Sequence, residues 1–442
     1  MAKKIFSIFM ISVFTFFSFA DGSKKVSEPD KKNFRFFSGF EFADLDGSMH
    51  KKGLEDCVKE EISYVLKDDL ERNYKEKYGI VGHSQGGLRV LAYATMLKRQ
   101  SEDFSLTENE RNIAKENYER LTAVITMSGI DKGLKALENN FATLKAKLLE
   151  DGNIILNGVY GLLKSSILLE GLGFFDKDIL NLKDAGTIID IVACFVPDVA
   201  RSYLYKAWEG ADYAEIPELY DMVPDSEFIR KNVSKTQKVV YKKQTGTRKY
   251  KTWEKVSWCW WWWVDHSEPV YTTYTAYKDI PLFDADLAVG YIIGTDSNTL
   301  GMAEDESGVR NGIDIAANFL EGAQIANHAK CYATAGIGFL TGHYTAYQNC
   351  CKARDWAKNI DGELNELKGS DENDGLVAKE SQFYPKQFYN PVTGKYEDVH
   401  TKVLLDRNGK GYTEVNKNHR DINCDDVLNS VVLEMLSEAG VK

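Results

Sequence analysis

Ser84 is the residue whose surroundings in the sequence point most directly to chemistry. It stands at the centre of Gly82-His83-Ser84-Gln85-Gly86, with the apolar pair Ile80-Val81 before it and apolar residues at helical spacing after it. Glycines two residues to either side of a serine are typical of a sharp strand-to-helix turn, because a side chain at either place would clash with the tightly folded backbone. Such a turn exposes the hydroxyl, as a nucleophile requires.

A serine hydroxyl is a weak nucleophile, so it needs a base within hydrogen-bonding distance and a carboxylate that orients the base. On a strand-turn-helix serine the order along the chain is serine, acid, histidine. His419 is the preferred base because it lies in a loop just before the last predicted helix, and His400, in a polar stretch, is the alternative. His83 belongs to the turn, and we expect its side chain to point elsewhere.

Two aspartates are candidates for the acid. Asp374 lies on a predicted turn ahead of the apolar pair Leu376-Val377, whereas Asp296 follows a predicted strand. The dipeptide Asp374-Gly375 is also a common turn with no catalytic role. Residue chemistry alone does not choose between the two carboxylates.

The elements that would position these residues alternate between strands and helices. This alternation predicts an α/β fold with a mostly parallel sheet covered by helices on both faces. The last helix carries an apolar stripe made of Val427, Leu428, Val431, Val432, Met435 and Leu436. We expect strands over 33–42, 121–127, 287–293 and 402–405, a strand leading into Ser84, and a helix over 52–75.

The chain divides into four predicted parts. Residues 1–20 have a basic start, an apolar block and small residues before Asp21, which is typical of a cleavable secretory signal and predicts a secreted or periplasmic protein. Residues 21–133 and 281–442 form the two parts of the core, and 134–280 form a lid or cap insertion between them. Seven cysteines, an odd number, leave at least one outside any intrachain disulfide.

The insertion contains a basic stretch, 235–277, that is rich in threonine, tyrosine and tryptophan. One interpretation is a buried β-hairpin. The other is a lid or platform that contacts lipid, since indoles favour a lipid-water interface and lysines favour anionic head groups. The net charge of −11 argues against a nucleic-acid partner.

Three motifs together resemble those of the secreted bacterial triacylglycerol lipases of the α/β-hydrolase fold: Gly82-His83-Ser84-Gln85-Gly86, Asn373-Asp374-Gly375 and Asn418-His419 with Asp421. The resemblance implies that Ser84 is the nucleophile, Asp374 the acid and His419 the base, with the backbone N–H of Gln85 in the oxyanion hole. It also allows a structural calcium ion at Asp421, although an aspartate there also suits the start of a helix.

The chain departs from that family at one element. No His-Gly pair, which would supply a second oxyanion donor, stands between Asp21 and Ser84, and Ser38-Gly39 is the substitute considered. Loss of one such donor lowers turnover by roughly 10²–10³.

We therefore expect a secreted serine hydrolase, a lipase or carboxylesterase that cleaves acyl esters of lipids through an acyl-enzyme and requires no cofactor. The alternatives are a catalytically weak protein that binds lipids or surfaces, and an esterase or acyltransferase that acts on small soluble acyl groups.

Overall fold

The computed structural model describes most of the chain in separate segments. The described residues are 34–37, 53–135, 217–257, 260–284, 286–298, 343–359, 372–399, 402–407, 409–419 and 421–441, together with a few positions between 310 and 370. The predicted signal segment 1–20 and residues 136–216 of the predicted insertion lie outside the described residues. The domain boundaries therefore stay a prediction.

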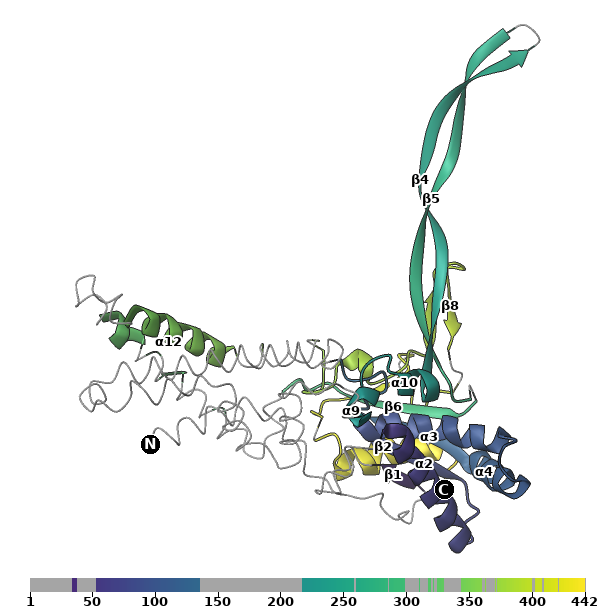
Figure 1. The fold of residues 1–442 in the computed structure, drawn as a ribbon, viewed down its shortest axis with the longest axis vertical. Coiled ribbons are helices and arrows are strands. Elements are labelled where there is room, and N and C mark those ends of the chain that lie inside the picture. Colours follow the sequence, from purple (N-terminus) through teal and green to yellow (C-terminus); the bar gives the residue numbers. More distant parts are fainter. Residues whose placement is uncertain are drawn as a thin grey trace.

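A five-stranded parallel sheet forms the centre of the described part of the chain (Figure 1). Neighbouring strands follow one another in chain order, and every pairing is parallel, so all the strands end at the same edge. This α/β character was predicted. The order across the sheet is β1 (Phe34–Phe37), β2 (Tyr78–His83), β3 (Leu121–Met127), β6 (Ala288–Gly294) and β9 (Thr413–Val415).

Three helices lie together on one face of the sheet. Helix α3 (Gln85–Glu102) packs on β1, β2 and β3, and both α2 (Leu54–Glu71) and α4 (Glu108–Arg120) pack against α3. The buried guanidinium of Arg35 in β1 forms ion pairs with Asp68 at 2.7 Å and Asp69 at 2.5 Å, both in α2. These contacts fix α2 against β1, the edge strand of the sheet.

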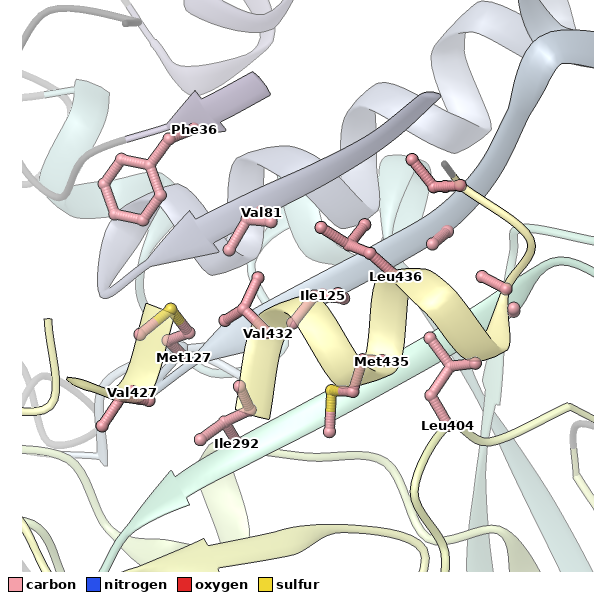
Figure 2. Close-up of a cluster of buried hydrophobic side chains, with 14 of the residues drawn as sticks. Phe36, Val81, Ile125, Met127, Ile292, Leu404, Val427, Val432, Met435 and Leu436 are labelled. Atoms are coloured by element: carbon pink, nitrogen blue, oxygen red, sulfur yellow. The ribbon is translucent and has the colours of Figure 1, made fainter. Parts of the chain in front are cut away.

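The carboxyl-terminal helical segment covers the opposite face. It runs through α14 (Asp425–Val427), the π-helical turn η9 (Leu428–Val432) and α15 (Leu433–Glu438). Its apolar stripe enters the core cluster, as predicted, and Figure 2 shows it lying across the strands. The cluster includes Phe36, Val81, Ala123, Ile125, Met127 and Ile292 from the sheet, with Val427, Val432, Met435 and Leu436 from the helical segment.

The predicted strand at 402–405 is wrong. Val403 forms only an isolated bridge with Val289, and the strand that pairs with the end of β6 is Thr413–Val415. Apolar side chains at 403–405 favour burial, and Leu404 is indeed buried in the core cluster. Strand pairing, however, depends on backbone groups, so a short strand of mixed polarity can take the edge position.

A long two-stranded hairpin projects away from the sheet (Figure 1). Its strands β4 (Ser234–Ser257) and β5 (Trp260–Pro281) pair antiparallel over their whole length. The interpretation of this segment as buried is wrong, because the side chain of Trp260 is 68% exposed and that of Trp262 is 67% exposed. A ribbon of only two strands has no third element to cover its side chains.

The remaining elements are short or peripheral. Among the described residues, no helix combines the length and the apolar character needed to cross a membrane. The short or peripheral elements are α9 (Pro217–Asp221), α10 (Glu227–Asn232), α12 (His343–Lys358), the 3-10 helix η8 (Lys379–Ser381), and the small antiparallel hairpin of β7 (Gln387–Asn390) and β8 (Lys395–Asp398).

Candidate active site

Ser84 occupies a strained turn between β2 and α3. Its φ of 57° and ψ of −124° lie outside the favoured regions for a residue with a side chain, at a cost of about 1–3 kcal/mol. Neighbouring loops hold the turn: the Ser84 N–H donates to the Met127 carbonyl at 3.1 Å, and its carbonyl accepts from Ile130 N–H at 3.2 Å. A Cβ at Gly82 would collide with the Gly86 backbone, so the predicted steric cause is confirmed at Gly82.

The structure brings the three predicted residues into one hydrogen-bonded chain. His419 Nε2 lies 2.8 Å from Ser84 Oγ, and His419 Nδ1 lies 2.8 Å from Asp374 Oδ2. All three side chains are buried. The His419 backbone N–H also donates to the Asp374 carbonyl at 2.6 Å, so the base and the acid are joined through both backbone and side chain.

The protonation pattern of this chain follows from Asp374. Burial is the largest influence on its pKa and acts to raise it, but nearby His419 and the accepted hydrogen bonds outweigh burial and leave the pKa below its ordinary value. An ionised carboxylate only accepts hydrogen bonds, so Nδ1 of His419 must donate. In a neutral imidazole Nε2 is then the acceptor, and the Ser84 hydroxyl donates to it.

The turn that carries Asp374 also orients its carboxylate. Oδ1 accepts the backbone N–H groups of Leu376 at 3.1 Å and Val377 at 2.7 Å, and Gly375 takes a φ of 95° that favours glycine. Asp296, the other candidate acid, instead accepts the backbone N–H of Asn298 at 3.0 Å. Geometry therefore favours Asp374. The alternative base, His400, lies outside the described residues.

His83 contributes to the site in a way that the sequence did not reveal. Its Nε2 lies 2.8 Å from the backbone carbonyl of His419. Burial, and then the proximity of His419, lowers the pKa of His83 to about 3, so the ring is neutral and this nitrogen donates its N–H. Because the two residues are 336 positions apart, no local pattern could have shown that His83 holds the loop of the base.

The predicted oxyanion donor, Gln85, is the first residue of α3. The first N–H groups of a helix have no carbonyl acceptor within it and carry the positive end of the helix dipole, so this position suits a developing negative charge. Strand β1 ends at Phe37, which pairs with Gly82. The substitute donor considered from sequence, Ser38-Gly39, lies outside the described residues.

Asp421, the candidate calcium ligand, makes its observed contacts with Asn418. The Asp421 carboxylate accepts a hydrogen bond from Asn418 Nδ2 at 3.0 Å, and its backbone N–H donates to Asn418 Oδ1 at 2.8 Å. The described residues contain no group of three or more histidine, cysteine, aspartate or glutamate side chains arranged to hold a metal ion. The Asp421 contacts observed are those of a turn that leads into the last helical segment.

A second buried carboxyl group, Asp131, lies behind the turn that carries Ser84. It follows β3, accepts a hydrogen bond from the Thr126 hydroxyl at 2.9 Å, and packs so closely that a Cβ at Gly129 would overlap it. Burial raises the pKa of Asp131 well above its ordinary value and so favours the neutral acid. Sequence reasoning did not single out this residue, because an aspartate after a strand is ordinarily solvated.

The chain matches no family model, no curated protein and no solved structure. The chemical meaning of the site therefore depends on its own geometry. That geometry joins a strained serine, a histidine and a buried carboxylate in hydrogen-bonding order.

Proposed function

We propose that the protein is a serine hydrolase of the α/β-hydrolase fold that cleaves carboxylic esters. The observation that carries the proposal is the chain of two 2.8 Å contacts from Ser84 through His419 to Asp374. In α/β-hydrolase folds the nucleophilic serine lies on a turn at the carboxyl ends of the strands. Ser84 has this position at the end of β2. A signal segment over 1–20 would place the enzyme outside the cytoplasm.

The reaction would proceed in two steps. Ser84 Oγ attacks the acyl carbon while its proton passes to His419 Nε2, and Asp374 stabilises the resulting imidazolium. The tetrahedral oxyanion is held by the backbone N–H of Gln85. The ester C–O bond then breaks, and the leaving alcohol takes the proton from His419. Water next attacks the acyl-enzyme with His419 as base, which releases the carboxylic acid and restores the Ser84 hydroxyl.

The substrate class proposed is an acyl ester of a lipid. Exposed indoles on the long hairpin favour contact with water-insoluble material. Small soluble acyl groups are the alternative substrates, and hydrolysis that does not increase when the ester forms an emulsion would favour them.

A non-catalytic protein that binds lipids is the second candidate, favoured by the absence of a His-Gly element between Asp21 and Ser84. Such a protein would keep the hydrogen-bonded triad but lack efficient stabilisation of the oxyanion.

Release of p-nitrophenol from acyl esters, with fluorophosphonate labelling of the purified full chain, tests the proposal. Ser84→Ala should abolish both signals, whereas Ser63→Ala, which changes an exposed serine on α2, should retain both. Ester hydrolysis that survives in Ser84→Ala would rule out Ser84 as the nucleophile. A folded wild type that neither hydrolyses nor labels would favour the non-catalytic candidate.

A further inference from the structure

The hairpin of β4 and β5 concentrates the exposed apolar surface of the protein at a distance from the candidate active site. Of the twenty exposed large apolar side chains in the described part of the chain, eleven lie on this hairpin. At about 3.3 Å per residue, its strands extend for roughly 75 Å, and the cross-strand pair Trp253 and Trp263 lies roughly 60 Å from the root. Figure 1 shows this far end well separated from the sheet.

The root of the hairpin is attached to the catalytic core. The Tyr384 hydroxyl lies 2.8 Å from Ser234 Oγ at the start of β4 and donates to the Asp131 carbonyl at 2.7 Å. Asp131 follows Ile130, whose N–H bonds the Ser84 carbonyl. The backbone of Leu282 also donates to Val233 at 2.9 Å across the root. Near the root, Lys278 of β5 also lies over the Phe388 ring of β7 and 3.8 Å from the Glu397 carboxylate of β8. The hairpin is thus fixed at its root.

The indoles at the far end point to both faces of the ribbon. Trp253 lies opposite Trp263, with ring centroids 5.3 Å apart, and Trp261 shares their face because side chains alternate along a strand. Trp262 lies opposite Glu254 on the other face, which Trp260 shares. Between 49% and 68% of each of these five side chains is exposed.

A flat protein surface can cover only one face of such a ribbon and would leave the indoles of the other face in water. A lipid interface surrounds an inserted end and accepts indoles from both faces, with the ring among acyl chains and the N–H near head groups. Residues 234–281 carry nine lysines and arginines against four aspartates and glutamates, in a chain whose net charge is −11. Lysines near the tip, such as Lys249 and Lys255, have no carboxylate partner among the described residues. This charge complements an anionic lipid surface.

We propose that the far end of the hairpin is a docking device that inserts end-on into an anionic phospholipid surface through Trp253 and Trp260–Trp263. The catalytic unit is then held at the membrane by a fixed arm, and the tip does not act as a lid over Ser84. Docking is independent of the catalytic proposal, because the tip contributes no group to the site. A protein without ester hydrolysis could still bind vesicles through the tip, and a protein that does not bind vesicles could still hydrolyse esters.

Cosedimentation of the full chain with phospholipid vesicles tests the proposal, using phosphatidylcholine alone and phosphatidylcholine mixed with phosphatidylglycerol. The wild type should bind the mixed vesicles more tightly, and its tryptophan emission should shift to the blue and be quenched by brominated acyl chains. One double variant, Trp260→Ser with Trp262→Ser, alters one face. The other, Trp261→Ser with Trp263→Ser, alters the opposite face.

Each double variant should bind about a hundredfold more weakly, because two indoles each lose roughly 50 Å² of inserted apolar surface, worth about tenfold per residue. The matched control is Tyr389→Ser with Tyr396→Ser on the small β7–β8 hairpin, where the side chains are 50% and 69% exposed. This control should bind like the wild type. Circular dichroism and hydrolysis of a soluble ester should be the same for all variants.

Three results would overturn the proposal. Tryptophan variants that bind vesicles as tightly as the control would show that the tip does not insert. If only one of the two double variants loses vesicle binding, the hairpin lies flat on the lipid surface and does not insert end-on. A wild type that ignores vesicles but forms dimers, which the tryptophan variants disrupt, would assign the tip to a second copy of the chain.

Discussion

Replacement of Asp374 by asparagine tests the proposed roles in the triad most sharply, since it changes one charge and almost no volume. In the wild type, Oδ1 accepts two backbone N–H groups and Oδ2 accepts the N–H of His419 Nδ1 at 2.8 Å. The Oδ1 contacts require an acceptor, so the asparagine carbonyl takes that position and its NH₂ group faces His419. Two donors cannot bond each other, so Nδ1 loses its proton.

The consequence is a reversed imidazole. With Nδ1 as acceptor, the proton of neutral His419 moves to Nε2, which then cannot take the proton of Ser84. The buried carboxylate that would stabilise the imidazolium is also gone. In serine hydrolases with this arrangement the same change lowers turnover by roughly 10⁴-fold, about 5 kcal/mol in activation free energy. The backbone bonds around residue 374 persist, so the fold should too.

Steady-state hydrolysis of a soluble p-nitrophenyl ester measures the effect, and it should fall mainly on kcat. Asp296→Asn is the matched control, because that carboxylate bonds only Asn298 among the contacts seen; its turnover should stay within a few-fold of the wild type. Thermal unfolding checks that both variants are folded. An Asp374→Asn enzyme within tenfold of the wild type, or an equal loss in Asp296→Asn, would refute the assignment of the acid.

Two further predictions concern the buried groups around the triad. His83→Ala removes the N–H that the His419 carbonyl accepts, and a buried carbonyl left without its donor should lower kcat by roughly tenfold. His83→Gln supplies an N–H again and should restore most of kcat. Equal kcat values in the two variants would argue against this role of His83. Burial raises the pKa of Asp131 in the folded protein above its unfolded pKa of about 3.9. Its contribution to stability is therefore present below the unfolded pKa and is lost as pH rises through the folded pKa. Asp131→Asn should therefore melt higher than the wild type by a margin that grows from pH 4 to pH 8, and a margin independent of pH in thermal unfolding would contradict the shift.

Local elements of the fold were predictable because their causes are local. The β-branched run at Leu121–Met127 forms β3, and the apolar stripe of the last helix enters the core. Gly82 acts through a contact within five residues, because a Cβ there would collide with the backbone of Gly86. The edge strand Thr413–Val415 was missed because its pairing uses backbone groups that any sequence supplies.

The exposure of the hairpin could not be predicted from its composition. Alternating aromatic and threonine residues suit both a strand of a packed sheet and a free ribbon. Only the absence of a third strand beside β4 and β5 in the described sheet topology distinguishes the two. The tryptophans, for which burial and lipid contact were both open from the sequence, are therefore a surface feature.

The amino-acid sequence by itself determined the turn at Ser84, the strand and helix that hold it, and a short set of carboxylates and imidazoles that could act with the proposed nucleophile. Tertiary structure decided which of these meet: Ser84 and His419 are 335 residues apart, and Asp374 precedes His419 by 45. A turn depends on sterics between neighbours in the chain, whereas a triad depends on how separate strands end at one edge of a sheet. The motif resemblance already favoured Asp374 over Asp296, and packing places the Asp374 carboxylate against His419 Nδ1 and the His83 ring against the His419 carbonyl.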